Sequence, residues 1–100
     1  MFYIYILYSS NSNKYYTGYT DNIERRLFEH NNSELSTFTS KYRPWEIAAL
    51  FECGNDRGNA IKIEKFIKRQ KSKKFLEDMI NGKDLYGMLA QLVRVPHMRN

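Results

Sequence analysis

The amino-acid sequence predicts one α+β domain built from three β-strands and three or more helices. Two runs of aromatic and β-branched residues near the N-terminus are separated by a short polar turn, a pattern typical of a β-hairpin. Later segments repeat apolar residues at helical spacing. A chain of 100 residues can form one hydrophobic core but not separate catalytic and binding domains, so any activity must share this fold.

The predicted hairpin comes first. Residues 2–8 are apolar or aromatic throughout, which predicts a strand with both faces covered. After a polar turn, strand character resumes at residues 15–19, where alternation places Tyr16 and Gly18 on the same face. Glycine weakens a strand unless something approaches its backbone closely, so Gly18 indicates a ligand surface.

A helix is predicted from about residue 22 to residue 31. Asp21 followed by Glu24 resembles a capping box. Arg26 and His30 stand one turn apart in a row beside the apolar stripe of this helix. Such a row can point across the edge of a sheet.

The middle of the chain adds a loop, a strand and a helix. Residues 31–40 are polar and predict a loop, and residues 47–53 predict the third strand. The apolar spacing of residues 59–71 predicts a second helix, with Glu64 stacked beside Lys68 at the border of its buried face.

The end of the chain has weaker patterns. A short third helix is expected up to residue 80, capped by Ser72, and one or two amphipathic turns follow near residues 85–93. We therefore expect a main domain at residues 1–81 and a helical or mobile extension at residues 82–100, whose basic tail follows Pro96.

Composition narrows the protein class. No segment approaches the eighteen or more apolar residues of a membrane helix, so we expect a soluble protein with no membrane partner. The N-terminal residues lack the features of a signal peptide, and the single Cys53, expected in the core, permits no internal disulfide. Both observations fit the cytoplasm.

The net charge of +5 is concentrated in one segment. Residues 61–74 contain seven basic residues and one acidic residue, so the remainder is close to neutral. This segment is either a phosphate-binding surface or a solvated helix face. Its basic residues are Lys62, Lys65, Lys68, Arg69, Lys71, Lys73 and Lys74.

Two three-residue motifs and two later residues, in this order, resemble a known signature. Residues 3–5 (YIY), ten intervening residues, residues 16–18 (YTG), then Arg26 and His30 resemble the GIY-YIG nuclease superfamily. The first motif has tyrosine where the family name has glycine, and the second has threonine in place of isoleucine. Over about residues 1–81 the chain resembles small stand-alone members similar to the nuclease domain of the excinuclease C subunit.

The resemblance implies a central three-stranded antiparallel sheet flanked by helices, and metal-dependent cleavage of phosphodiester bonds. It also implies site residues, position by position. Tyr5 and Tyr16 are the motif tyrosines, Gly18 is the motif glycine, Arg26 is the catalytic arginine, Glu64 is the metal ligand, His30 matches a position of histidine or tyrosine, and Gln70 is the nearest candidate for a downstream polar residue.

These residue types suit phosphodiester hydrolysis. Tyr16 would accept a proton or orient water, although a phenol with a pKa of about 10 needs help from a cation or from a second acceptor such as His30. Tyr5 would position the water or the phosphate. Arg26 can give forked hydrogen bonds to phosphate oxygens. Mg²⁺ or Mn²⁺ needs only one or two carboxylates, so Glu64 suffices for one ion.

We therefore expect a metal-dependent endonuclease acting on DNA, with a role in repair or recombination at branched, nicked or damaged structures; RNA stays open as a substrate. The alternatives are a nucleic-acid-binding module that does not cut, and an interaction domain that needs a partner protein. Tyr42 and Trp45 are candidates for stacking on an unpaired base, and Trp45 is equally compatible with the core.

Overall fold

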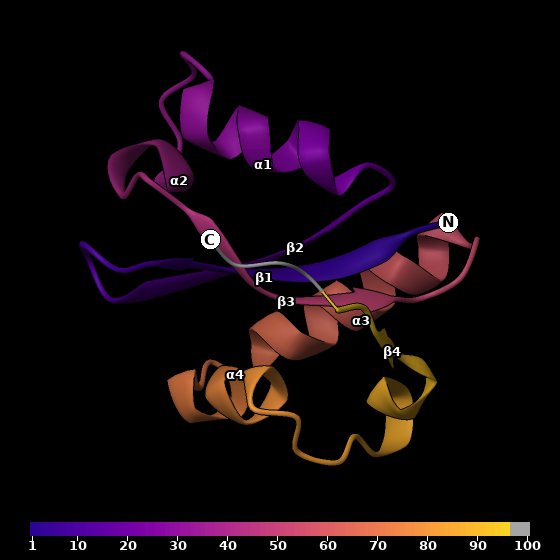
Figure 1. Cartoon of the computed structure of the whole chain (residues 1–100). Coiled ribbons are helices and arrows are strands. Elements are labelled where there is room, and N and C mark those ends of the chain that lie inside the picture. The colour runs from indigo at the N-terminus through magenta and orange to yellow at the C-terminus, as the bar shows by residue number, and fades with distance from the viewer. Residues whose placement is uncertain (97–100) are drawn as a thin grey trace.

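The computed structural model describes residues 1–96 and contains a four-stranded antiparallel sheet between two groups of helices (Figure 1). The α+β prediction is confirmed. The strand order across the sheet is β2-β1-β3-β4, so β2 forms one edge. The strands are β1 (Tyr3–Ser9), β2 (Lys14–Thr20), β3 (Glu46–Glu52) and β4 (Val93–Arg94).

The count of three strands was wrong because β4 was missed. This strand has two residues, which pair with Phe51 and Glu52 of β3. Arg94 also donates from Nη1 to the carbonyl oxygens of Met79 and Ile80, at 3.2 and 3.0 Å. So short a strand has no detectable alternation, and its conformation depends on the strand beside it.

Strand β1 lies at the centre of the sheet. Its residues Ile4, Tyr5, Ile6 and Leu7 are all buried, as the absence of polar positions predicted. Alternate side chains enter two different cores, one on each face of the sheet. This central strand therefore joins the two helical layers.

On one face lie α1 (Ile23–Asn32) and the short α2 (Phe38–Lys41) (Figure 1). The N-cap of α1 is Asn22, whose side chain accepts from the Arg25 backbone N–H. The predicted capping box at Asp21 was therefore wrong, since Asp21 instead pairs with the Arg25 guanidinium at 3.2 Å.

Helix α2 occupies part of the segment predicted as a loop. Four residues are too few to show helical periodicity, and local capping defines the turn. Thr37 and Ser40 cap it reciprocally, each side chain bonding the backbone of the other. The next segment enters β3 with Trp45 buried in the core.

On the other face lie α3 (Arg57–Arg69), α4 (Lys73–Ile80) and the 3-10 helix η1 (Gly87–Gln91) (Figure 1). Ser72 caps α4 as predicted. Cys53 is buried in the core on this face, which confirms its structural assignment.

The C-terminal segment up to residue 96 packs against the rest of the chain. Leu89 and Leu92 are buried in the same core as Ile63 and Ile67 of α3. The boundary at residue 81 stays a prediction, and the tail beyond residue 96 lies outside the described residues. Within the described residues, no helix has the length and hydropathy required to span a membrane.

Candidate active site

A cleft of about 430 Å³ lies at the β2 edge of the sheet. Its lining includes Tyr5 of β1, Tyr16 of β2, Arg26 of α1 and Glu64 of α3. We call it the β2-edge cleft. Since α1 and α3 cover opposite faces of the sheet, only an edge lets both reach one concave surface (Figure 1). The structure thus brings together four residues that lie far apart in the sequence.

A chain of hydrogen bonds runs through Tyr5. Arg26 Nε donates to Tyr5 Oη at 3.3 Å, and Tyr5 Oη lies 2.8 Å from His30 Nε2. On the far side of the ring, His30 Nδ1 lies 2.9 Å from Thr39 Oγ1. Because Tyr5 is buried, its hydroxyl proton needs an acceptor, and His30 Nε2 is the acceptor in reach among the described residues. Nδ1 of the neutral imidazole then carries the proton and donates to Thr39.

The pKa values agree with this assignment. Burial raises the pKa of the Tyr5 hydroxyl well above its usual value, although Arg26 acts in the opposite direction. Burial, followed by the charge of Arg26, lowers the pKa of His30 to about 4. At neutral pH, therefore, Tyr5 is protonated and His30 is neutral, and together they fix the position of Arg26.

The expectation that His30 assists Tyr16 was wrong in its geometry. The Nε2 atom of His30 is bonded to Tyr5, whereas Tyr16 meets the His30 ring edge-on, with centroids 5.0 Å apart. A cation is present instead, because Lys68 Nζ lies 4.9 Å from the centroid of the Tyr16 ring.

Gly18 faces Tyr5 across the β1–β2 ladder. A Cβ atom built at Gly18 would overlap with Oη and Cζ of Tyr5. The close approach inferred from the sequence is real, but the group that approaches is the Tyr5 ring and not a ligand. Gly18 is thus needed to seat the hydrogen-bonded tyrosine.

Arg26 keeps donors for a ligand. Its Nη1 donates to Glu29 Oε1 at 3.1 Å, and its Nε is used by Tyr5. A guanidinium has five N–H donors, so most remain available while the group is held in place by two neighbours. This arrangement suits a phosphate oxygen.

Glu64 is suited to serve as a ligand of a magnesium or manganese ion. Its side chain is 17% exposed within the cleft, and Lys68 Nζ is 3.7 Å from Oε1, a weak ion pair rather than a tight hydrogen bond. No group of three or more His, Cys, Asp or Glu side chains that could hold a metal occurs in the described part of the chain. Mg²⁺ commonly takes one or two protein carboxylates and completes its shell with water, which a single glutamate satisfies.

The cleft also contains carboxylates that the sequence did not suggest. Asp21 and Glu29 line it, but each is ion-paired with an arginine of α1, Arg25 and Arg26 respectively. Glu64 is therefore the cleft carboxylate without an arginine partner among the described residues.

Comparison with known proteins agrees with this geometry. The family model described as the GIY-YIG catalytic domain matches residues 1–77. The chain belongs to the GIY-YIG family. This is a nuclease family, and the match spans all the cleft residues named above.

The chain is also similar to curated proteins of comparable size, which are small members of the GIY-YIG family. The UPF0213 protein HQ_3675A of Haloquadratum walsbyi is 37% identical over 79 residues, covering 76% of this chain and 86% of that protein. The UPF0213 protein in the ldhD 5'region of Pediococcus acidilactici is 32% identical over 83 residues, covering 81% and 83%. The UPF0213 protein SSP2268 of Staphylococcus saprophyticus is 34% identical over 79 residues, covering 76% and 94%.

A basic groove adjoins the β2-edge cleft. It has a volume of about 500 Å³, lies between β2 and the junction of α3 with α4, and shares Tyr16 with the β2-edge cleft. Its cations are Lys14, Lys68, Lys71 and Lys73. We call it the lysine groove, and it gives three of the predicted lysines a common surface.

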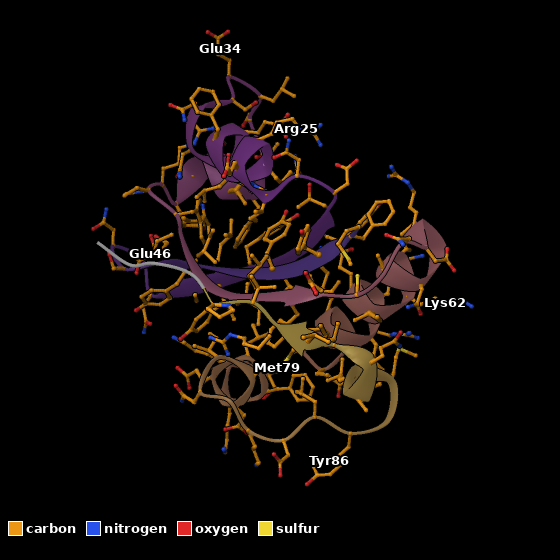
Figure 2. The ribbon with its side chains drawn as sticks, turned by 45° about the vertical axis from the view of Figure 1, so that its right-hand side comes forward. Arg25, Glu34, Glu46, Lys62, Met79 and Tyr86 are labelled. Carbon is orange, nitrogen blue, oxygen red and sulfur yellow. The ribbon has the colours of Figure 1, made fainter. Side chains whose placement is uncertain are left out.

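The other predicted cations lie elsewhere. Lys65 and Arg69 line another depression, which they share with Lys68 and Lys71, and Lys74 pairs with Asp78 at 3.1 Å. Lys62 projects from the outside of α3 (Figure 2). The DNA-binding role of all these side chains stays a prediction.

Three cations that line the groove or the cleft were not predicted from the sequence, and the structure gives no support to a site role for Gln70. Lys14 stands two residues before Tyr16 on β2, so strand alternation could have identified it. Arg25 and Arg57 line the cleft, but no sequence pattern points to them. Gln70 donates to the Phe66 carbonyl oxygen and does not line the cleft.

Proposed function

We propose that this GIY-YIG protein is a divalent-metal-dependent endonuclease that hydrolyses phosphodiester bonds in DNA. The observation that supports the proposal is the convergence of Tyr16, Arg26 and Glu64 on the β2-edge cleft. These side chains come from a strand and from helices on both faces of the sheet. A molecule that only bound nucleic acid would have no physical need for this combination.

Arg26 binds the scissile phosphate in this proposal. Its free N–H donors bond the non-bridging oxygens and stabilise the charge that develops there in the transition state. Tyr5 and His30 are positioning residues, since both are buried and act through Arg26. Their hydrogen bonds hold the guanidinium before substrate arrives, so little reorganisation is needed during the reaction.

Glu64 holds one Mg²⁺ or Mn²⁺ ion. When bound, such an ion supplies Lewis-acid stabilisation of charge on the phosphate oxygens. Tyr16 lines the cleft together with Glu64 and Arg26 and orients the attacking water through its hydroxyl. Lys68 contacts the ring of Tyr16 and the carboxylate of Glu64, and so holds the two side chains close to each other.

The lysine groove carries the DNA backbone to the cleft. Lysine side chains bind phosphates without reading bases, so the proposed enzyme selects DNA structure rather than sequence. This mode of recognition is consistent with branched or nicked substrates and with a role in repair or recombination.

Cleavage assays test the proposal directly. Labelled linear, nicked, branched and single-stranded DNA is incubated with the protein and Mg²⁺, Mn²⁺ or chelator. We expect metal-dependent cutting of at least one substrate, and a loss of at least roughly 100-fold in Glu64→Gln with DNA affinity in chelator nearly unchanged.

Glu34→Gln is the matched control, because Glu34 is exposed in the loop after α1 and does not line the cleft (Figure 2). The control should cut like the wild-type protein. The proposal fails if no substrate is cut with either metal, or if Glu64→Gln cuts as well as the control.

A further inference from the structure

A second hollow lies beside the β2-edge cleft, between α1 and α2. Its volume is about 310 Å³, and its lining includes Tyr16 and Arg26, which also line the cleft. Leu35 and Phe38 belong to this hollow alone. We call it the Phe38 hollow. Because Arg26 lines both cavities, the Phe38 hollow adjoins the position proposed above for the scissile phosphate.

Phe38 presents an exposed ring in this hollow. The residue is 47% exposed, although its ring is close to three other aromatic rings. The Phe38 and Tyr16 rings are stacked, with centroids 6.2 Å apart and planes 27° apart, and the Tyr42 ring lies 5.0 Å from Phe38. Phe38 thus extends an aromatic cluster from the core to the surface.

The backbone that carries Phe38 is firmly fixed. Helix α2 is capped at Thr37, and Trp45 Nε1 donates to the Thr39 carbonyl oxygen at 2.7 Å. The Thr39 hydroxyl is hydrogen-bonded to His30 of the Tyr5 network, and Arg43 Nε donates to the His30 carbonyl oxygen at 2.7 Å. A ligand that stacks on Phe38 therefore orders little of the protein, which favours binding.

Two lysines and Arg26 lie near this aromatic surface, and Glu29, the ion-pair partner of Arg26, also lines the hollow. Lys14 Nζ lies 5.1 Å from the centroid of the Tyr42 ring, Lys41 is exposed on α2, and Arg26 lines the hollow. A flat apolar ring among cations complements a ligand that is itself flat and anionic, which describes a nucleotide. The exposed apolar side chains of the hollow, Leu35 and Phe38, are far too few for a stable protein interface.

We infer that Phe38 is a stacking platform for one unpaired nucleobase of DNA next to the phosphate held by Arg26. This inference rests on the proposed function and adds a substrate class to it. Bases within a duplex are stacked on their neighbours and cannot reach the ring. The protein therefore prefers DNA with an unpaired nucleotide beside the cut, such as a flap or a single strand, over perfect duplex.

Binding without cleavage tests this platform. The full chain is titrated in chelator into a duplex with a single-stranded flap, whose first unpaired base is 2-aminopurine, and into a perfect duplex with the same probe paired. Stacking quenches 2-aminopurine fluorescence, and anisotropy gives the Kd. We expect quenching with the flap only, and Phe38→Ala to abolish it and weaken flap binding by roughly 5- to 100-fold while duplex binding changes less than twofold.

Two variants separate stacking from folding. Phe38→Trp keeps an aromatic face and should retain quenching and affinity, whereas Phe38→Leu keeps apolar bulk and should lose the quenching. Phe28→Ala is the matched control, since Phe28 of α1 is also exposed but does not line the hollow, and it should behave like the wild-type protein. Equal binding of flap by Phe38→Leu and wild-type protein, or an equal loss for flap and duplex in Phe38→Ala, would overturn the inference.

The two proposals fail separately. Metal-dependent cutting by Glu34→Gln together with unchanged flap binding in Phe38→Leu would refute the platform and leave the nuclease. Quenching that depends on Phe38, in a protein that cuts no substrate, would support the platform and refute the nuclease.

Discussion

The substitution Gly18→Ala tests whether strand β2 holds the Tyr5 ring in place. Tyr5 and Gly18 are partners in the β1–β2 ladder, and a Cβ at position 18 would overlap with the tyrosine Oη and Cζ. Tyr5 is buried, so its ring cannot shift without displacing the side chains packed around it. Either the ring leaves its rotamer or β2 moves away from β1.

The expected cost follows from this overlap. Forcing an extra methyl group into a packed core costs about 1–3 kcal/mol. In a domain of this size each kcal/mol lowers Tm by roughly 4–8 °C, so we expect a decrease of roughly 5–20 °C. Displacing Oη also breaks its bonds to His30 and Arg26, so the proposed cleavage should fall even at temperatures where the variant is fully folded.

Thermal unfolding followed by circular dichroism measures the effect. Gly58→Ala is the control, because a Cβ there would meet only Asp56 Oδ1 at 3.3 Å in the first turn of α3. Its stability should change by less than about 1 kcal/mol. In a Tyr5→Leu background the ring is absent, so Gly18→Ala should cost little. An unchanged Tm, or an equal cost in both backgrounds, would refute the reasoning.

Two more predictions follow from the same site. Since the pKa of buried His30 is lowered to about 4, the unfolded chain binds a proton between about pH 6.5 and 4 that the folded chain does not. As the pH is lowered through that window, the free energy of unfolding should thus fall by on the order of 1–3 kcal/mol. Urea unfolding should show a smaller fall in His30→Gln than in the wild-type protein. Identical falls would contradict the assignment. In the lysine groove, Lys71→Gln with Lys73→Gln should flatten the slope of log Kd against log salt by roughly 1–2, and Lys62→Gln should not. Equal effects would show that all the cations of α3 and α4 act as one diffuse surface.

The sequence predicted the local parts of the site well. Alternation along β2 correctly placed Tyr16 and Gly18 on one face, and helical spacing correctly put Arg26 and Glu64 at the borders of their helices. Both predictions depend on periodicity, which the sequence shows directly. The meeting of these side chains across the sheet edge follows because both helices lie beside the same edge strand.

What the sequence missed depends on contacts between distant segments. Gly18 was interpreted as a ligand surface because alternation says which residues share a face, but not which residue lies opposite. Phe38 lies in a segment with no apolar period, and its stacking position depends on Trp45 and Thr39. Of the two aromatic residues suggested for base stacking, Trp45 is core, and the Tyr42 ring is tilted against that of Phe38, with centroids 5.0 Å apart.

The proposed site requires that no further strand pairs with the outer edge of β2. An unpaired edge strand invites pairing with another chain, and proteins commonly protect such edges with lysine, as Lys14 does at the start of β2. A further strand beside β2 would cover Tyr16 and separate Arg26 on one face from Glu64 on the other. Three cavities share Tyr16, so this edge strand is where they meet, and the proposed substrate runs past it.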